Sequence, residues 1–278
     1  MHRLQGKVAF ITGAARGQGR SHAVRLAQEG ADVIIFDMCE DVDSNHYSLA
    51  TEADLAHTAK LIEAEGRRVV ASKVDVRDRA GLEVALAAAV SELGQLNIVV
   101  ANAGICPLGD DVPLGGFVDA FDIDFIGVVN TIHAALPLIE DGGSIIATGS
   151  LAALMPGGLT SPGGMGYGLA KRSIVSYIKS VAHLLAARGI RANTVHPTNC
   201  NTDMLQSVPM YKMFRPDLEN PTVDDVKAAF ASMHPIPTPW VEPEDVSSAV
   251  VYLASDESRY FTGQEMRIDA GAGLAMGL

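Results

Sequence analysis

The stretch that decides the fold is Lys7-Val8-Ala9-Phe10-Ile11-Thr12-Gly13-Ala14-Ala15-Arg16-Gly17-Gln18-Gly19, followed by an amphipathic run with Val24, Leu26 and Ala27. An apolar run that ends at a glycine-rich turn and continues into an amphipathic run predicts a buried strand, a tight turn and a helix start. Glycines let the backbone approach a pyrophosphate, and a helix N-terminus offers unpaired N–H groups with a partial positive charge. The stretch therefore predicts a dinucleotide site that includes Gly13, Arg16, Gly17, Gln18 and Gly19.

An acid follows this turn at the distance that a dinucleotide site requires. The next apolar run, Val33-Ile34-Ile35-Phe36, ends at Asp37, which lies 18 residues after Gly19 (37 − 19). The acid that binds an adenosine ribose stands about 20 residues beyond the glycines. The alternative is a surface acid at the end of a strand. A carboxylate here opposes a 2′-phosphate by charge, so the sequence favours NAD over NADP, while Arg16 either contacts a phosphate or is a solvated arginine.

The bulk composition bounds the class of protein. The chain has 278 residues, 48% of them hydrophobic, which is enough apolar material for a sizeable core. Its 21 basic and 33 acidic residues give a net charge of −12, which argues against a nucleic-acid or anionic-membrane partner. Three cysteines without metal-like spacing argue against a disulfide framework and a metal site. We expect one cytoplasmic domain over residues 1–278, without a signal peptide or a membrane span.

Apolar runs alternate with helical patterns along the whole chain. Strands are expected at 8–12, 32–36, 68–73, 97–101, 143–148, 191–196 and 265–269, with helices between them. This order predicts a single Rossmann-type α/β fold, a doubly wound parallel sheet with helices on both faces. Ligands of such sheets bind beyond the carboxyl ends of the strands. Each motif residue stands at such an end: Gly13, Asp37, Asp75, Asn102, Ser150 and Pro197.

Three segments fall outside the regular alternation. Residues 38–51 show no periodicity, and residues 151–166 are rich in glycine and proline, so both are expected to be loops. One long helix is expected from Phe117 past Ile132. Residues 198–241 are expected to form an irregular lid with a single short helix at 223–233. Its side chains either pack the lid alone or line an apolar substrate pocket: Met204, Leu205, Met210, Tyr211, Met213 and Phe214.

A phenol and an amine stand four residues apart in Tyr167-Gly168-Leu169-Ala170-Lys171, which puts both on one face of a helix. Alone the pattern is common, and its ordinary interpretation is a surface pair. Here it follows the strand that ends at Ser150, so three suitable groups would converge beside the dinucleotide. A phenol is a poor base at neutral pH, and a neighbouring ammonium favours the phenolate. We predict that Ser150, Tyr167 and Lys171 are catalytic, with Ser150 holding the substrate oxygen.

Five motifs in this order make the sequence similar to the short-chain dehydrogenase/reductase family over its whole length. They are Thr12-Gly13-x-x-x-Gly17-x-Gly19, Asp75-Val76, Asn102-Ala103-Gly104, Ser150 and Tyr167-x-x-x-Lys171. The resemblance implies an NAD(P)-dependent oxidoreductase with Tyr167 as the acid/base. Lys171 would bind the nicotinamide ribose and lower the tyrosine pKa, and the family expectation is a homotetramer. It also implies cofactor contacts at Met38, Asp75, Val76, Asn102, Ala103, Gly104, Pro197, Thr198, Asn199 and Thr202.

The finer resemblance is to the carveol-dehydrogenase-like, mycofactocin-associated branch. Three features carry it: Gly13-Ala14-Ala15-Arg16-Gly17-Gln18-Gly19-Arg20-Ser21-His22, the extra segment 38–51, and His196-Pro197-Thr198-Asn199. This branch implies NAD that is held rather than exchanged, and a peptide-derived redox carrier, mycofactocin, as the electron acceptor. We expect residues 38–51 to fold over the cofactor, with Tyr47 and Leu49 as apolar cover. The alternative is a decorative surface loop.

The sequence departs from the family pattern in two places. The family's fourth catalytic residue is an asparagine in Asn-x-x-Gly on the long helix. This chain has Asp124 at that position, before Gly127, so the resemblance makes Asp124 the fourth catalytic candidate. A carboxylate can hold a water but cannot donate hydrogen bonds, and it raises the cost of a phenolate. Asn130 lies too far along the helix to replace it. The spacing from Ser150 to Tyr167 is also longer than usual, so Gly157-Gly158 and Pro162-Gly163-Gly164 are expected to loop out.

Together these features predict oxidation of a secondary, apolar or cyclic terpenoid-like alcohol to a ketone, with hydride transfer to NAD. One alternative is a carbonyl reductase that runs the same chemistry in reverse. Another is a dinucleotide-binding scaffold without turnover, which only Asp124 supports. His133, His183 and His196 show no ligand spacing and are interpreted as ordinary helix or strand residues.

Overall fold

The computed structural model describes residues 2–109, 111–155 and 159–278, and in these ranges a seven-stranded parallel sheet forms the centre of the molecule. The strands are β1 (Val8–Thr12), β2 (Asp32–Asp37), β3 (Val69–Lys73), β4 (Ile98–Ala101), β5 (Ser144–Thr148), β6 (Arg191–Pro197) and β7 (Glu265–Ile268). Their order across the sheet is β3-β2-β1-β4-β5-β6-β7. The predicted doubly wound parallel sheet is therefore confirmed.

Side chains alternate between two apolar cores on the two faces of the sheet. In β1, Ala9 and Ile11 belong to one core, and Val8 and Phe10 belong to the other. Every residue of β1 is buried, as expected for a central parallel strand covered on both sides. The continuous apolar runs in the sequence have this physical cause.

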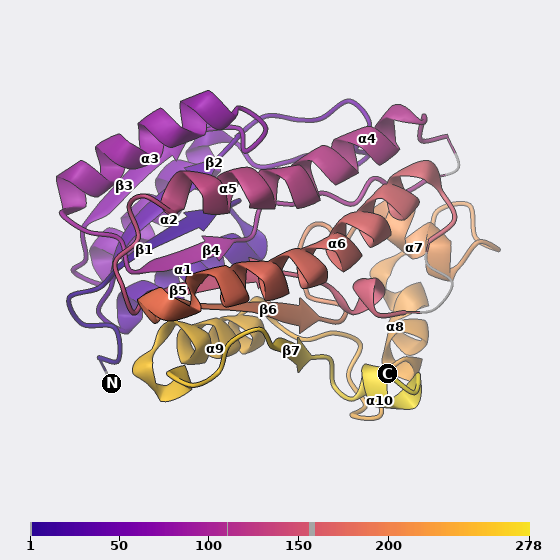
Figure 1. Ribbon diagram of the computed structural model, residues 1–278. Coiled ribbons are helices and arrows are strands. Elements are labelled where there is room, and N and C mark those ends of the chain that lie inside the picture. Colours follow the sequence, from indigo (N-terminus) through magenta and orange to yellow (C-terminus); the bar gives the residue numbers. More distant parts are fainter. Residues whose placement is uncertain (1, 110, 156–158) are drawn as a thin grey trace.

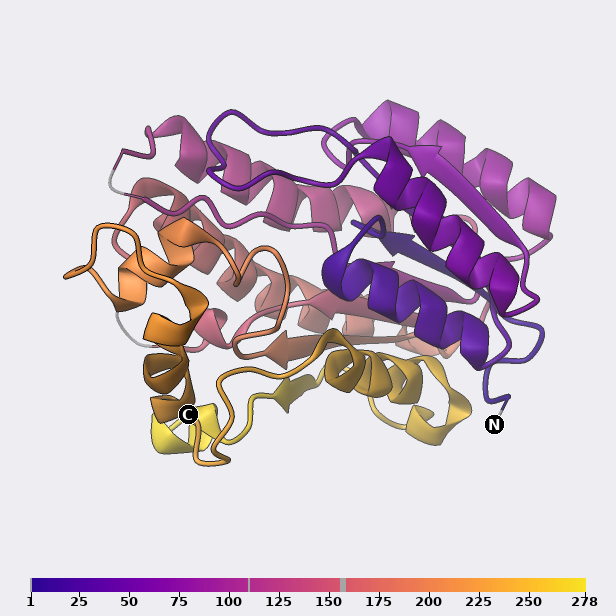
Figure 2. The ribbon, with the colours of Figure 1, turned by 180° about the vertical axis from the view of Figure 1, so that it is seen from behind.

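Helices cover both faces. In Figure 1, α3 (Arg79–Leu93), α5 (Gly127–Ala135) and α6 (Pro162–Leu185) lie in front of the sheet, with α4 (Gly115–Phe121) leading into α5. Seen from behind in Figure 2, α1 (Gly17–Gln28), α2 (Glu52–Ala64) and α9 (Pro243–Ala254) cover the opposite face. The α2 helix is capped at its N-terminus by Thr51, which forms a capping box with Asp54.

The strand order reverses direction at β1, which pairs with β2 on one side and with β4 on the other. Ile11 stands opposite Ile35 of β2 and Val100 of β4. At this switch point the loops after β1 and β4 lead away to opposite faces and leave a crevice beyond the strand ends. The glycine-rich turn lies at the mouth of that crevice.

The helix predicted to run unbroken from Phe117 past Ile132 is interrupted. Residues Asp122–Ile126 form a π-helical turn between α4 and α5. A π turn accommodates one extra residue, often at a functional site. Here it turns Ile123 and Asp124 inward, and both are buried. Residue types alone do not reveal this local widening.

The loop prediction for 151–166 is wrong in its second half, because α6 already begins at Pro162. Ser161 caps it, and its hydroxyl accepts a hydrogen bond from the Gly164 amide at 3.3 Å. A side chain on Gly163 would collide with the Pro107 carbonyl oxygen, and one on Gly166 with the Phe117 carbonyl oxygen. These glycines permit close helix packing. The Pro162-Gly163-Gly164 segment is therefore helical rather than looped out, and Gly157-Gly158 lies outside the described residues.

The region after β6 contains more helix than the sequence predicts. It forms α7 (Val208–Phe214) and α8 (Val223–Ser232), and the chain ends with the short α10 (Ala272–Ala275). Leu205, Tyr211, Val226 and Phe230 form a separate small core beneath α7 and α8. In both ribbon views this lid stands at the carboxyl ends of the strands. Among the described residues, no helix is long and apolar enough to cross a membrane.

Candidate active site

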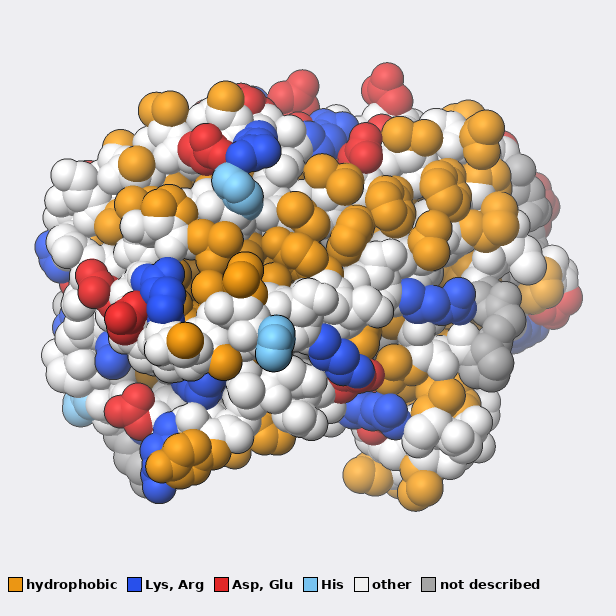
Figure 3. All heavy atoms as spheres, in the orientation of Figure 1, with side chains coloured by type: hydrophobic (Ala, Val, Ile, Leu, Met, Phe, Trp, Pro, Cys, Tyr) orange, Lys and Arg blue, Asp and Glu red, His pale blue; other side chains and the backbone are white. Residues whose placement is uncertain are grey.

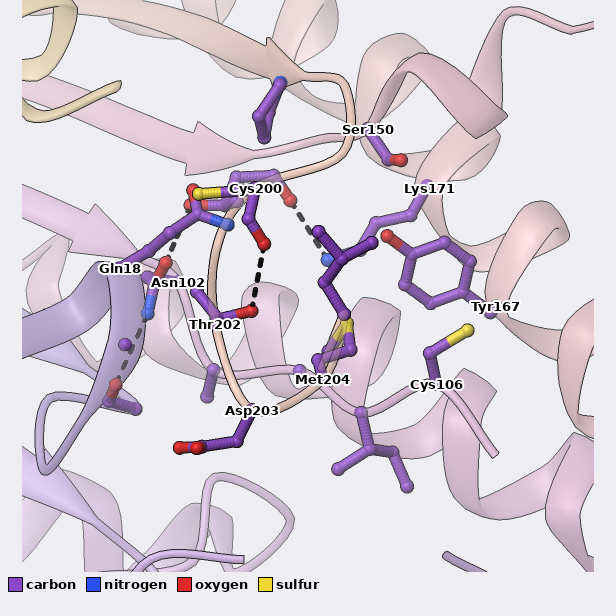
Figure 4. A pocket seen from close by; sticks show the side chains of 18 of the residues that line it. Gln18, Asn102, Cys106, Ser150, Tyr167, Lys171, Cys200, Thr202, Asp203 and Met204 are labelled. Carbon is purple, nitrogen blue, oxygen red and sulfur yellow. Dashed lines mark hydrogen bonds between the residues drawn. The ribbon is translucent and has the colours of Figure 1, made fainter. Parts of the chain in front are cut away.

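A cavity of about 320 Å³ opens beyond the carboxyl ends of the strands. Its walls come from the glycine-rich turn, the ends of β2, β4, β5 and β6, residues 38–50, and the lid. Figure 4 shows Ser150, Lys171 and Tyr167 together on one side of it, with Gln18 and Asn102 on the other. The predicted residues that line it are Gly13, Arg16, Gly17, Gln18, Gly19, Asp37, Met38, Val76, Asn102, Ala103, Gly104, Ser150, Tyr167, Lys171, Pro197, Thr198, Asn199 and Thr202.

The glycine-rich turn keeps its backbone bare because no side chain fits there. Gly13 has φ +66°, and an added Cβ would come 2.7 Å from the Cα of Ala103. A side chain on Gly19 would strike the Gly13 carbonyl oxygen. Gly17, with φ +54°, begins α1 directly at the cavity. The helix N-terminus is therefore open to an anionic group.

The polar groups around this turn fit a dinucleotide. The Oε1 atom of Gln18 is buried and lacks a hydrogen-bond partner among the described residues, although Gln18 lines the cavity. A buried polar atom without a partner is costly, so a ligand donor is expected there. The bare glycine backbone suits a phosphate, and the Gln18 oxygen suits a hydroxyl or amide donor elsewhere on the same ligand.

Asp37 is held at the end of β2 by two backbone amides. Its carboxylate accepts hydrogen bonds from Ala15 N at 3.0 Å and from Cys39 N at 3.1 Å. Burial raises the pKa of Asp37, and these amides act in the opposite direction. Asp75 is placed differently: Arg77 holds its carboxylate with contacts down to 2.7 Å, and the pair lines a separate polar hollow beside Met38. Asp75 is therefore not brought into the main cavity, whereas Val76 is.

Asn102 ties three strands together at the crevice. Its side-chain amide donates to the carbonyl oxygens of Thr12 at 3.1 Å and Gly13 at 3.3 Å, and it accepts from the Thr148 hydroxyl at 3.1 Å. These bonds fix the glycine-rich turn relative to β5. The side chain thus supports the shape of the site as well as lining it.

The three predicted catalytic side chains meet in the cavity. Lys171 is almost fully buried, its ammonium donates to the Thr148 carbonyl oxygen at 3.0 Å, and it lies 5.5 Å from the ring centre of Tyr167. The nearby Ser150 hydroxyl lowers the pKa of the Tyr167 phenol. The α6 helix carries Tyr167 and Lys171 one turn apart, and the end of β5 presents Ser150.

Burial nevertheless raises the pKa of Tyr167 well above its usual value, and the nearby Cys106, Asp124 and Tyr47 act in the same direction. Lys171 is not among the main causes of this shift, so its expected lowering of the phenol pKa stays a prediction. Asp124 limits any such effect, because its Oδ2 lies 3.4 Å from the Lys171 ammonium and partly balances that charge. The ammonium is shared between Asp124 and the Thr148 carbonyl rather than directed only at the phenol.

Asp124 lies behind the cavity wall. It is fully buried, and its Oδ1 accepts a hydrogen bond from Ile105 N at 2.8 Å. Burial raises its pKa to about 6, against the opposing effect of Lys171. Within the described ranges its Oδ2 has no hydrogen-bond partner besides this ion-pair contact. Asn130 points elsewhere, with its amide donating to the Val76 carbonyl at 2.9 Å.

Arg16 is not a solvated arginine. Its guanidinium forms an ion pair with Asp203 at 3.2 Å and donates to the Ser48 carbonyl oxygen. Asp203 belongs to the segment after β6, and Ser48 belongs to residues 38–51, which we name the strap. Arg16 thus links the lid side of the cavity to the strap, directly beside the glycine-rich turn.

The strap is pinned along its length to the segment after β4. The Tyr47 hydroxyl accepts a hydrogen bond from Cys106 N at 3.2 Å, and the Ser44 hydroxyl donates to Asp119 at 2.7 Å. His46 contacts Asp111 at 3.1 Å. Apolar contacts add to these: Met38, Val42 and Leu49 pack with Val76, Ala103, Ile105 and Ile123. Met38, Tyr47, Leu49 and Ala50 line the cavity.

The segment after β6 contributes backbone and lid contacts. The Thr198 hydroxyl contacts His234 at 2.8 Å, the Asn199 amide lies 3.8 Å from the Met233 sulfur, and the Thr202 hydroxyl donates to the Cys200 carbonyl at 3.3 Å. Cavity residues not predicted from the sequence include Ile105, Cys106, Met155, Leu159 and Asp203. They lie in loops, whose sequences have no periodicity from which cavity residues could be predicted. No group of three or more His, Cys, Asp or Glu with metal-binding geometry occurs in the part of the chain that the structure describes.

The chain is similar to known proteins over nearly its whole length. A family model described as enoyl-(acyl carrier protein) reductase matches residues 13–273. The chain is 45% identical to (−)-trans-carveol dehydrogenase of Rhodococcus erythropolis, covering 99% of this chain and 100% of that protein. The crystal structure of carveol dehydrogenase from Mycobacterium avium in complex with NAD is 43% identical, with a TM-score of 0.93 and coverage of 99% and 100%. A short chain dehydrogenase from Mycobacterium paratuberculosis bound to NAD is 37% identical, with a TM-score of 0.85 and coverage of 98% and 99%. The chain therefore belongs to the short-chain dehydrogenase/reductase family.

Proposed function

We propose that this protein oxidises a secondary, apolar or cyclic terpenoid-like alcohol to a ketone, with NAD as the hydride acceptor. The observation that carries the proposal is the meeting of Ser150, Tyr167 and Lys171 in one cavity beside the glycine-rich turn. That arrangement provides a hydrogen-bond donor, an acid/base and a fixed cation at the place where a dinucleotide would end.

Each residue has a defined task. The substrate hydroxyl binds between Ser150 and Tyr167, and Tyr167 removes its proton. Lys171 favours the phenolate and is available to the nicotinamide ribose, while NAD supplies the hydride acceptor when it is bound. The same groups run carbonyl reduction in reverse, with Tyr167 donating the proton, so the direction follows the redox state of the cofactor.

NAD is preferred over NADP because Asp37 stands at the adenosine side of the crevice. Its carboxylate, fixed by two amides, can accept ribose hydroxyls and repels a 2′-phosphate. The NAD complexes of the Mycobacterium avium and Mycobacterium paratuberculosis proteins support this choice. Gln18, Val76, Asn102 and Thr202 would complete the cofactor contacts.

The substrate end of the cavity is apolar. Side chains from the lid and from the loop after β5 line it: Leu151, Met155, Leu159, Leu205, Met210, Met213, Phe214 and Met233. Flexible methionines adapt to an irregular hydrocarbon. The relation to (−)-trans-carveol dehydrogenase supports a cyclic terpenoid alcohol as the substrate class.

We further propose that the strap retains NAD between turnovers and that a peptide-derived carrier, mycofactocin, takes the electrons. The strap is held at Cys106, Asp119 and Arg16, on both sides of the crevice. A cofactor beneath it can leave only after these contacts open. Hydride must then be passed to a second acceptor that reaches the nicotinamide end.

The assembly that we propose is a homotetramer. An exposed apolar face runs along α4, the π turn and α6, and Figure 3 shows such side chains gathered across this side of the molecule. It includes Leu114, Val118, Ile126, Met165 and Leu169. A face of this kind marks an interface. Light scattering should give four chains for the parent and fewer for a Val118→Glu, Leu169→Glu double variant.

The test of the proposed function starts with the purified protein. The bound nucleotide is released by denaturation and identified, and a panel of secondary alcohols that includes (−)-trans-carveol is then assayed with an artificial electron acceptor. We expect NAD and turnover of cyclic secondary alcohols. Bound NADP, or no turnover with any alcohol or with the matching ketones in the reverse direction, would contradict the proposal.

A further inference from the structure

A buried histidine lies directly behind Ser150. His196 is the sixth residue of β6 and has no exposed surface. Its Nδ1 lies 3.0 Å from the Ser150 carbonyl oxygen and 3.3 Å from the Ser150 amide nitrogen. Its Nε2 lies 2.7 Å from the Thr194 hydroxyl. The ring therefore connects the interior of β6 to the backbone of a residue in the active site.

The hydrogen-bond chemistry makes this contact specific. A carbonyl oxygen only accepts, so the 3.0 Å contact requires a proton on Nδ1, and Nε2 then accepts from the Thr194 hydroxyl. In the other neutral tautomer, Nδ1 accepts from the Ser150 amide and Nε2 donates to Thr194. Both arrangements fix the Ser150 backbone. Burial lowers the pKa of His196, so the ring stays neutral and either arrangement is available at physiological pH.

Close packing also restricts the backbone just before Ser150. A side chain on Gly149 would collide with the His196 ring, so the ring lies flush against the residue before Ser150. Ser150 then leaves β5 in an extended conformation, with φ −166° and ψ 151°. Its hydroxyl accepts a hydrogen bond from Ala152 N at 3.1 Å, and Ser150 lines the same cavity as Tyr167. The ring and the following short turn thus fix Ser150 from both sides.

We infer that His196 is a positioning residue: it holds the Ser150 backbone so that the Ser150 hydroxyl faces Tyr167 and the substrate oxygen. The inference rests on the proposed function, because it assigns His196 a part in the same reaction. It also replaces the interpretation of His196 as an ordinary strand residue. A histidine with only a core role would also need a hydrogen-bond partner, but it would not affect turnover.

Two substitutions separate a positioning role of His196 from a purely structural one, because each retains a hydrogen-bonding group at the place of one imidazole nitrogen. In His196→Asn the amide nitrogen occupies the place of Nδ1 and can still reach Ser150. In His196→Gln the amide extends to the place of Nε2 and can still reach Thr194. The readouts are kcat and KM for an alcohol substrate with an artificial acceptor, bound NAD, and the unfolding temperature. Thr194→Val is the matched control: it removes the far contact of the ring, together with the 3.4 Å hydrogen bond from the Thr194 hydroxyl to the Gln264 carbonyl oxygen.

We expect His196→Gln to lower kcat by about ten-fold, since misplacing a catalytic group by a fraction of an ångström has effects of this size. His196→Asn and Thr194→Val should remain within about three-fold of the parent, and KM and bound NAD should hardly change. If His196→Gln retains the parent kcat, or if Asn and Gln reduce it equally, the inference is overturned.

A double-mutant cycle with Ser150→Ala completes the test. Ser150→Ala should lower kcat about 100-fold, as for the loss of one oxyanion donor. If His196 acts through Ser150, adding His196→Gln to that variant changes kcat by less than about two-fold. A full further ten-fold loss in the double variant would refute the positioning role while leaving the proposed function intact. An unchanged kcat in Ser150→Ala alone would instead refute the role of Ser150 in the proposed function.

Discussion

The Tyr47→Phe variant should release NAD faster than the parent protein. The substitution removes the Tyr47 hydroxyl from the strap and leaves the aromatic ring in place. The Tyr47 hydroxyl is the acceptor for the Cys106 amide at 3.2 Å, and Tyr47 lines the cavity. Without this hydroxyl, the Cys106 amide has no acceptor while the strap is closed, but it can donate a hydrogen bond to water when the strap is open. The substitution therefore destabilises the closed strap relative to the open one. A buried donor without a partner costs about 1–3 kcal/mol. Because about 1.4 kcal/mol corresponds to a factor of ten, NAD should dissociate roughly 10-fold faster, within a range of about 5- to 150-fold.

The assay is displacement of the bound NAD by an excess of a fluorescent analogue in stopped flow. His46→Gln is the matched control, because His46 is also in the strap but pairs with the exposed Asp111. An exposed ion pair contributes less than about 1 kcal/mol, so release should change by less than about five-fold. An equal release rate for the parent and Tyr47→Phe, or a parent protein that arrives empty and exchanges NAD within the mixing time, would refute the retention of NAD by the strap.

Two further substitutions test the electrostatics of the site. Burial raises the pKa of Asp124 from 3.8 to about 6 in the folded protein. Between these two pH values the folded state still holds a proton that the unfolded state has lost. The free energy of unfolding therefore falls as the pH rises through this window. Asp124→Asn should remove this fall, so the difference in unfolding free energy between parent and variant should change by about 2 kcal/mol from pH 4 to 7, and a constant difference would contradict it. The same variant should lower the pH at which oxidation is half-maximal, because the Asp124 charge raises the pKa of Tyr167; a large loss of rate without a pH shift would give Asp124 a separate role. Asp37→Ala should weaken NAD and improve NADP in a titration, and an unchanged ratio of affinities would remove Asp37 from the adenosine site.

The fold was predictable because the strands carry their own signal. The central strands are continuous apolar runs, which is what burial on both faces requires, and each run ends at a turn residue such as Gly13 or Asp37. The convergence of Ser150, Tyr167 and Lys171 follows from the same logic, because the carboxyl ends of parallel strands meet at one edge.

The failures have physical causes as well. The glycines at 163, 164 and 166 resemble a loop, but they lie in α6 and leave room for close neighbours: the backbone at Pro107 and Phe117 and the Leu159 side chain. The π turn around Asp124 changes the direction of a buried acid without changing the residue pattern. That turn brings Asp124 to the Lys171 ammonium, so the pKa of Tyr167 could not be judged from its spacing to Lys171 alone.

The role of Arg16 was missed for a different reason. Its partners, Ser48 and Asp203, come from two segments without periodicity, and only the folded chain brings them to the same guanidinium. The hydrogen bond of Tyr47 could not be predicted for the same reason, since its hydroxyl accepts from a backbone amide of another loop rather than from a side chain. Contacts between loops are set by tertiary packing, which single-residue patterns do not encode.

The most direct test of the central claim is a single-turnover experiment on the NAD-loaded protein and its Tyr167→Phe variant. Each is mixed with a saturating secondary alcohol such as (−)-trans-carveol, and the near-ultraviolet absorbance of reduced nicotinamide is followed in time. The parent should reduce its bound NAD, at a rate that rises with pH because the pKa of Tyr167 lies above its usual value. The variant, which folds and binds NAD like the parent, should show no reduction on the same timescale. Reduction in Tyr167→Phe within ten-fold of the parent rate would contradict the assignment of Tyr167 as the acid/base.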